Sequence, residues 1–179
     1  MEQYGSNTTI TTRTRLILLD CFETLVELDG AAYRPRKGVK DFLTWFRDRQ
    51  PTKLVVISDA ERSLVEGALS QAGLTGFLFA VYHAGNALER FGEGRSRKRL
   101  DLPIAELGVT LAQTVFIGDS PLDGEAAAHY KVPFIRVPRS EDRAFSFTTL
   151  ISGPSRYNSQ EFSVTFLDSF AKKPDTDPR

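Results

Sequence analysis

The 179-residue chain has the length of one compact domain, which can bury a hydrophobic core without disulfides or structural metals. Lys and Arg number 23, as do Asp and Glu, so the zero formal net charge argues against binding nucleic acid or membrane through bulk charge. Hydrophobic residues make up 41% of the sequence, which is too many for a wholly disordered chain.

The cysteine content and the N-terminal segment indicate a cellular compartment. Cys21 is the single cysteine and cannot form an internal disulfide, which fits a reducing environment. The first 15 residues are polar and lack the apolar region of a signal peptide. No run of apolar residues approaches the roughly 18 needed for a membrane span. We therefore expect a cytoplasmic protein that does not bind membranes.

Five short apolar runs have the look of strands buried on both faces of a parallel sheet. The first run ends at Asp20, the second at Ser58 and the fourth at Gly118-Asp119. Each of the five is followed by polar residues, glycine or proline. The runs span residues 16–19, 54–57, 77–82, 115–117 and 134–137.

The segments between these runs carry apolar residues at the spacing of one helix face. Helices are predicted around residues 39–46, 64–72, 104–107 and 123–128. Strands that alternate with helices predict an α/β fold, with a three-layer, Rossmann-like parallel sheet and helices on both faces. Ligands bind such sheets beyond the carboxyl ends of the strands, where Asp20, Ser58 and Asp119 fall.

We expect a single domain over residues 14–171, with a flexible N-terminal arm at 1–13 and a tail at 172–179. Within the domain, residues 140–171 form a C-terminal extension. Phe145 and Phe147 alternate with polar residues there, as do Phe162, Val164 and Phe166. This alternation predicts packed chain in the form of a hairpin or edge strands.

A carboxylate at the tip of a buried strand, such as Asp20, can act as a nucleophile in phosphoryl transfer and form an aspartyl-phosphate. Attack on a phosphate dianion requires neutralising charge. Carboxylates at the end of a neighbouring strand supply it by holding Mg²⁺, a hard cation that takes oxygen ligands.

With these residues in view, the sequence resembles the haloacid dehalogenase (HAD) superfamily of hydrolases, whose four motifs appear in order over residues 14–138. Asp20 to Thr24 matches Asp-x-x-x-Thr after a strand, and Ser58 ends the second strand. Gly118 to Asp123 matches Gly-Asp-x-x-x-Asp. A basic residue precedes the fourth strand in the family. The candidates are Arg95, Arg97, Lys98 and Arg99, of which Lys98 is chosen because lysine is the usual type.

The resemblance implies a role for each matched residue. Asp20 is the implied nucleophile, and Lys98 offsets charge. The hydroxyls of Thr24 and Ser58 bind the oxygens of the phosphoryl group. The implied ligands of Mg²⁺ are the carboxylates of Asp20 and Asp119, the backbone carbonyl of Phe22, and waters oriented partly by Asp123.

Phe22 departs from the family pattern. The phosphatases of the family usually have a second Asp two residues after the nucleophile, which acts as the general acid and base. A phenyl ring cannot transfer a proton, and that role is worth about 10²- to 10⁴-fold in rate. Either the substrate has a good leaving group, or another group such as Glu23 or Asp59 substitutes, or activity is low.

Three functions follow from this pattern. The first is a Mg²⁺-dependent phosphatase, and the second is a weak or inactive module that binds a phosphorylated partner. The third is a 2-haloacid dehalogenase-like hydrolase. An aromatic residue at position 22 resembles the dehalogenase branch of the family. Attack on carbon gains little from a pair of metal-binding carboxylates, so Asp119 and Asp123 favour phosphoryl chemistry.

The short connections between motifs leave no room for a large cap domain. The segment after the first motif holds only a turn and a short hairpin, with Asp29-Gly30 as its turn. In this family a minimal cap implies an open site and a phosphorylated substrate that can be macromolecular. Arg34, Arg36 and Lys37 are interpreted as scattered surface charge.

Overall fold

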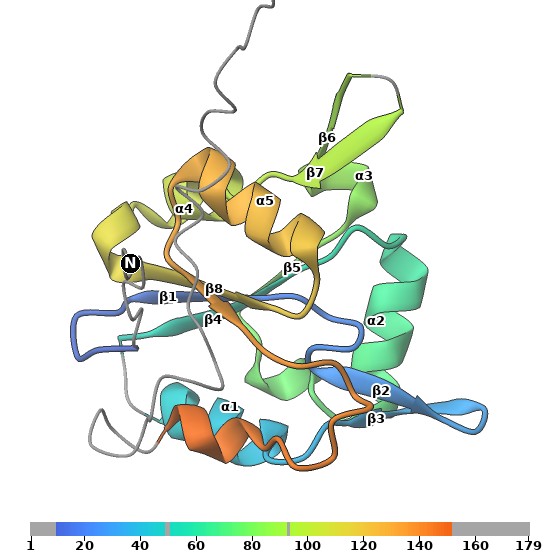
Figure 1. Ribbon diagram of the computed structural model, residues 1–179. Coiled ribbons are helices and arrows are strands. Elements are labelled where there is room, and N and C mark those ends of the chain that lie inside the picture. The colour runs from blue at the N-terminus through green and yellow to red at the C-terminus, as the bar shows by residue number, and fades with distance from the viewer. Residues whose placement is uncertain (1–9, 49–50, 93, 152–179) are drawn as a thin grey trace, which may run out of the picture.

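The computed structural model describes residues 10–48, 51–92 and 94–151. A central parallel sheet lies between helical layers (Figure 1), with the strand order β5-β4-β1-β8-β9. Asp20 thus follows the middle strand. The five strands are β1 (Leu16–Leu19), β4 (Lys53–Ile57), β5 (Ala80–Tyr82), β8 (Thr114–Gly118) and β9 (Phe134–Arg136).

Side-chain alternation along β1 divides the core in two. Ile17 and Leu19 belong to one buried cluster, and Leu16 and Leu18 belong to the other. These clusters confirm the predicted three-layer α/β fold. The helices α1 (Val39–Arg47) and α2 (Arg62–Gln71) contribute to the first cluster, and α4 (Asp101–Leu107) and α5 (Pro121–Tyr130) contribute to the second.

The four predicted helices are present, and α1 follows its predicted face closely. Its apolar residues are buried at positions 39, 42, 43 and 46. In α2, Val65 and Leu69 are buried, but Leu64 was wrongly placed on the core face and is exposed. Ser58 does not cap this helix, because the N-cap residue is Glu61. Gly108 ends α4 in the left-handed conformation.

Two of the predicted strands are too long. The strand predicted from residue 77 begins only at Ala80, because the preceding residues form a 3₁₀ turn, η1 (Thr75–Phe77). The strand predicted to end at residue 137 ends at Arg136. Apolar composition alone does not distinguish a turn from a strand.

Two antiparallel hairpins stand outside the central sheet (Figure 1). The first pairs β2 (Val26–Asp29) with β3 (Ala32–Pro35), and Gly30 in its turn has a φ of 64°, as the predicted tight turn requires. The second follows α3 (Ala84–Ala87) and pairs β6 (Leu88–Phe91) with β7 (Arg95–Lys98). The sequence did not predict the second hairpin. Both inserts are small, which agrees with a minimal cap.

The described part of the C-terminal extension packs against α1. Phe147 is fully buried, and its ring centroid lies 5.4 Å from that of Phe42. It begins a 3₁₀ helix, η3 (Phe147–Leu150), so the strand form predicted for residues 145–147 was wrong. A Cβ on Gly38, where φ is 78°, would lie 2.8 Å from the backbone nitrogen of Thr148. Glycine therefore permits this close contact.

Several sequence-based predictions fall outside the described residues. They are the arm at residues 1–9, the pattern at residues 162–166 and the tail at residues 172–179. Within the described ranges, no helix has both the length and the apolar character that crossing a bilayer requires.

Candidate active site

The carboxyl ends of three neighbouring strands bring the predicted site residues to one edge of the sheet. Asp20 follows β1, Ser58 follows β4 and Asp119 follows β8, with β1 between the other two. The parallel register pairs Leu19 with Val56 and with Ile117, so the three strands end at the same level. Asp20 and Asp119 are each only 6% exposed.

Thr24 lies between these two carboxylates. Its hydroxyl oxygen is 3.0 Å from Oδ2 of Asp20 and 2.8 Å from Oδ1 of Asp119, and the residue is fully buried. A hydroxyl has one hydrogen to donate, so it can donate to only one carboxylate at a time. This geometry makes Thr24 a residue that positions the candidate nucleophile and its neighbour.

Lys98 is the basic residue that enters the site. Its ammonium nitrogen lies 2.5 Å from Oδ1 of Asp20 and 2.5 Å from Oδ1 of Asp123, and the residue is 7% exposed. The end of the hairpin strand β7 places it there. The three competing residues pair with other carboxylates: Arg95 with Glu125, Arg97 with Glu89, and Arg99 with Asp101.

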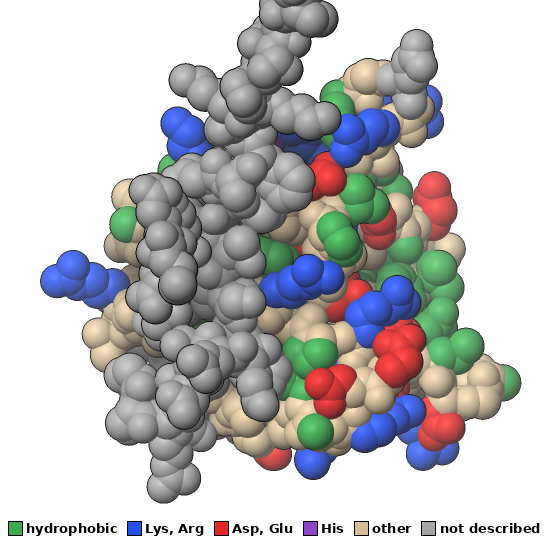
Figure 2. Space-filling model, viewed as in Figure 1, with side chains coloured by type: hydrophobic (Ala, Val, Ile, Leu, Met, Phe, Trp, Pro, Cys, Tyr) green, Lys and Arg blue, Asp and Glu red, His purple; other side chains and the backbone are tan. Residues whose placement is uncertain are grey.

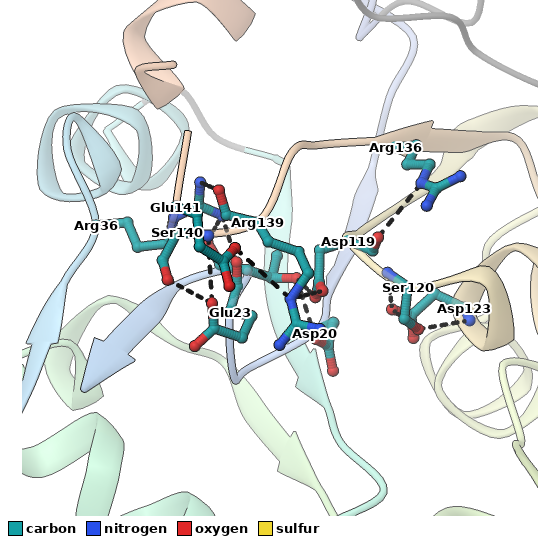
Figure 3. Close-up of polar contacts among 11 residues, drawn as sticks. Asp20, Glu23, Arg36, Asp119, Ser120, Asp123, Arg136, Arg139, Ser140 and Glu141 are labelled. Carbon is teal, nitrogen blue, oxygen red and sulfur yellow. Dashed lines mark hydrogen bonds and ion pairs between the residues drawn. The ribbon is translucent and has the colours of Figure 1, made fainter. Parts of the chain in front are cut away.

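Asp123 has two roles in the fold of the site. It is the third residue of α5 and forms a capping box with Ser120, whose backbone nitrogen and hydroxyl donate to its Oδ2 at 3.2 and 2.7 Å. Its other oxygen accepts from Lys98. A Cβ on Gly118 would lie 2.6 Å from Asp123 Oδ2, so a residue without a side chain is required there. Figure 3 shows the contact between Ser120 and Asp123.

Ser58 and Phe22 complete the set of residues predicted from the sequence. Ser58 is fully buried at the tip of β4, and its hydroxyl oxygen accepts a hydrogen bond of 3.3 Å from the backbone nitrogen of Ala60. The Phe22 ring packs edge-on against Tyr33 of β3, with centroids 5.3 Å apart. The side chain at this position therefore packs against the first hairpin. The roles of the Phe22 carbonyl and of Ser58 toward ligands stay predictions.

Burial shapes the electrostatics of the site. It raises the pKa of Asp20 from 3.8 to about 7, an effect that Lys98 opposes and the charge of Asp123 reinforces. Burial also raises the pKa of Asp119. For Lys98, burial lowers the pKa, but Asp20 and Asp123 outweigh it and raise the pKa above its ordinary value. Lys98 is therefore a permanent cation among the acidic groups.

The acidic groups have the chemistry of a divalent-cation site. Asp20, Asp119 and Asp123 each offer a carboxylate oxygen within 4.8 Å of the others. Three carboxylates facing one ammonium leave negative charge in a buried place, and a hard divalent cation bound to oxygen would offset it. The donor set therefore fits Mg²⁺.

A second polar cluster, which the sequence did not predict, connects the loop after Asp20 to the loop after β9 (Figure 3). Arg36 donates to the backbone oxygen of Glu23 and, at 3.1 Å, to that of Arg139. The Glu23 carboxylate accepts from the Ser140 backbone nitrogen at 3.2 Å and from its hydroxyl at 2.5 Å. Arg36 is only 5% exposed, which corrects its interpretation as surface charge.

Arg139 brings a guanidinium to the edge of the site from this second loop. Its Nε lies 3.7 Å from Oδ2 of Asp119 and 4.0 Å from Glu141, and its side chain is 60% exposed. Because Arg139 lies far from Asp20 in the chain and outside the four motifs, no local pattern allowed sequence reasoning to find it.

Glu23, one of the two residues considered as a substitute acid, does not stand free at the nucleophile. The Glu23 carboxylate is bonded to Ser140 on the neighbouring loop. Asp59 is an exposed residue immediately after Ser58. Glu23 is therefore not available to replace the carboxyl group that Phe22 lacks.

The sequence matches one family model over most of its length. Residues 5–130 match the model of the haloacid dehalogenase-like hydrolases. No curated protein matches the sequence.

Solved structures share the fold at low sequence identity. A HAD-superfamily hydrolase from Geobacter sulfurreducens PCA is 13% identical with a TM-score of 0.55, and the match covers 71% of this chain and 93% of that one. A predicted phosphoglycolate phosphatase from Haemophilus somnus 129PT is 13% identical, with a TM-score of 0.61 and coverage of 78% and 92%. The Mg-complexed N-terminal part of a Bacteroides fragilis protein, which contains a phosphatase domain, is 12% identical, with a TM-score of 0.57 and coverage of 78% and 40%. At these identities the likeness shows the fold alone.

Replacing Lys98 by Met should lower the free energy of unfolding by about 3–5 kcal/mol at neutral pH, because two buried carboxylates lose their partner. Urea denaturation measures this loss. Arg95→Met is the matched control: its side chain is 57% exposed in the pair with Glu125, so the cost should stay below about 1 kcal/mol. Equal losses in the two variants would contradict the structural role of Lys98.

Proposed function

Because the chain belongs to the haloacid dehalogenase-like hydrolase family, we propose that it is a Mg²⁺-dependent phosphatase that works through an aspartyl-phosphate on Asp20. The observation that carries this proposal is the convergence of the Asp20, Asp119 and Asp123 carboxylates within 4.8 Å at the end of the central strands. The likeness in fold to a structure described as containing a phosphatase domain complexed with Mg supports it.

Asp20 is suited to nucleophilic attack by the arrangement of its two oxygens. Lys98 donates to Oδ1, while Oδ2 lies against the Thr24 hydroxyl. These contacts orient the carboxylate, and Lys98 opposes the rise in pKa that burial causes. A carboxylate oxygen of Asp20 attacks phosphorus, the bond from phosphorus to the ester oxygen breaks, and the leaving group departs as its alkoxide or phenolate anion. Water then hydrolyses the acyl phosphate and restores Asp20.

The metal would be held by the carboxylates of Asp20 and Asp119 and by the Phe22 carbonyl, with Asp123 acting on its waters. When bound, Mg²⁺ neutralises charge on the phosphoryl oxygens. The chain's own donors add to this effect. The Ser58 hydroxyl is placed at the tip of β4, where its hydrogen can be donated to a phosphoryl oxygen.

The lack of a proton donor at position 22 narrows the class of substrate. An ester with a poor leaving group needs protonation as the bond breaks, whereas an aryl or acyl phosphate does not. The two small hairpins leave the site without a large cap among the described residues. We therefore propose a substrate with a good leaving group, and the open site admits a phosphorylated macromolecule.

Phe22 also favours a second candidate function, a module that binds a phosphorylated partner without turnover. Its ring packs against Tyr33, so the position serves packing of the first hairpin and supplies no acid. Such a module would keep the metal and phosphate sites but would release little or no phosphate.

Asp20→Asn should reduce the release of phosphate from an aryl phosphate by about 10³-fold or more, because the amide is not a nucleophile. Phosphate release is measured with and without Mg²⁺. Asp41→Asn, at an exposed position in α1, is the control and should keep most of the activity. Equal rates for the Asp20→Asn variant and the wild-type protein would remove the proposed nucleophile.

Stabilisation by Mg²⁺ should grow with pH. The raised pKa of Asp20, about 7, means that the folded metal-free protein holds a proton that the unfolded chain releases near 3.8. The stability that this proton contributes is therefore lost as the pH rises through about 7. Mg²⁺ needs the ionised carboxylates and offsets their burial.

Thermal unfolding with and without MgCl₂ at pH 5.5 and pH 8 tests this expectation. The increase in melting temperature should be larger at pH 8, and Asp119→Asn should abolish most of it. The same increase at both pH values would contradict the metal site on these carboxylates.

Phe22→Asp restores the missing carboxyl and separates the two candidate functions. If the site is otherwise complete, hydrolysis of an alkyl phosphate should rise by about 10²- to 10⁴-fold, the usual worth of general acid and base catalysis. Phe22→Leu removes the ring without adding an acid and is the control. An equal effect of both substitutions would show that proton transfer does not limit the site.

A further inference from the structure

Arg139 is an exposed cation beside the candidate metal ligands, and the mechanism above gives it no role. Its Nε lies 3.7 Å from Oδ2 of Asp119, and Figure 3 shows the two side chains facing each other. The side chain is 60% exposed, so it faces both the buried carboxylates and solvent. A group bound at the site from solvent would meet it.

The charge balance of the site calls for such a cation. Three carboxylates and one ammonium leave two negative charges, which one divalent cation would cancel. A phosphate ester at neutral pH brings up to two more. Lys98 cannot neutralise the charge of the phosphate ester, because its ammonium already contacts Asp20 and Asp123 at 2.5 Å and is buried. An additional positive group is needed at the side open to solvent.

Hydrogen bonds hold the backbone at Arg139 and at the residue that follows it. Its carbonyl oxygen accepts from Arg36 at 3.1 Å, and the next residue, Ser140, is held by the Glu23 carboxylate. Glu23 belongs to the loop that directly follows Asp20, and it has a left-handed φ of 58°. The loop after β9 is therefore tied to the loop of the nucleophile, which fixes the backbone from which the guanidinium extends.

Other basic side chains nearby are engaged differently. Arg136 donates to the backbone oxygen of Asp119 at 3.3 Å. Arg143, further along the same loop, pairs with Glu27 on β2 at 2.8 Å. Figure 2 shows basic and acidic side chains next to one another on the described part of this face. The position of the guanidinium, and not a broad positive surface, thus distinguishes Arg139.

From this geometry we propose that Arg139 is a substrate-binding residue, whose guanidinium takes oxygens of the phosphoryl group. This inference rests on the proposed phosphatase function for the identity of the ligand. Guanidinium matches a phosphoryl group because its planar donors can bind two oxygens at once. When it leaves Asp119, Arg139 can place its positive charge on the phosphoryl group, which Lys98 cannot do while it is paired with Asp20 and Asp123.

The experiment measures the binding of inorganic phosphate in the presence of Mg²⁺ by isothermal titration calorimetry, with the full chain. Arg139→Ala should weaken phosphate binding by about 10- to 100-fold, as loss of a hydrogen bond to a charged group does. It should raise KM for an aryl phosphate by a similar factor. Arg139→Lys, which keeps the charge but loses the planar donors, should fall between the wild type and the Ala variant.

Arg143→Ala is the matched control on the same loop. Its side chain is 74% exposed and its pair with Glu27 lies away from the site carboxylates, so phosphate affinity should change less than about twofold. Melting temperatures of the variants confirm that each one is folded. Wild-type affinity for phosphate in Arg139→Ala would overturn the proposal, as would a wild-type protein that binds no phosphate.

Failure of the two proposals is distinguishable. Phosphate binding that depends on Arg139, with no hydrolysis of any ester, would refute the phosphatase and support Arg139 as the anion-binding residue of a phosphate-binding module. Hydrolysis that depends on Asp20, with phosphate affinity and KM unchanged in Arg139→Ala, would support the phosphatase and refute the role of Arg139.

Discussion

The structure depends on how one sheet edge accommodates three buried carboxylates with a single ammonium ion. Moving a charge out of water costs several kcal/mol, and one cation cannot satisfy three anions. Lys98 bonds to Asp20 and Asp123, and Asp119 relies on the Thr24 hydroxyl and the more distant Arg139. Burial raises the pKa of Asp20 and of Asp119, and the charge of Asp123 adds to the effect at both. We propose that this unpaired negative charge binds a divalent cation and, through that cation, a phosphoryl group.

The fold supports this arrangement with groups that never approach a substrate. Parallel pairing of β1 with β4 and β8 ends the strands at one level, so residues distant in the chain meet without long side chains. The capping box of α5 fixes Asp123 through Oδ2 and leaves Oδ1 for Lys98. The absence of a side chain at Gly118 allows that carboxylate to lie against the strand end. Ser120 and Asp123 therefore both stabilise the start of α5 and fix the geometry of the site.

The sequence was informative where a residue's place follows from local pattern. Continuous apolar runs located the central strands, and the polar residues that end them, Asp20, Ser58 and Asp119, came together because parallel strands share an edge. Sequence reasoning could not find the role of Arg139 or the burial of Arg36, because the bond between them joins segments 103 residues apart and ends on a backbone oxygen. The hairpin of β6 and β7 was missed since its strands are rich in charged residues, yet that hairpin delivers Lys98 to the site.

Phe22 connects the chemistry to the openness of the site. Its ring lies against Tyr33, so the position that would hold an acid instead packs the segment after the nucleophile against the first hairpin. The neighbouring Glu23 is used in the same structural way, since its carboxylate holds the loop of Arg139. Phe22 and Glu23 thus serve packing and loop attachment. Neither one supplies a free carboxyl group as a general acid. A phosphoryl group at such a site would be stabilised by charge from Arg139 and a bound cation, which suits an ester whose leaving group needs no proton.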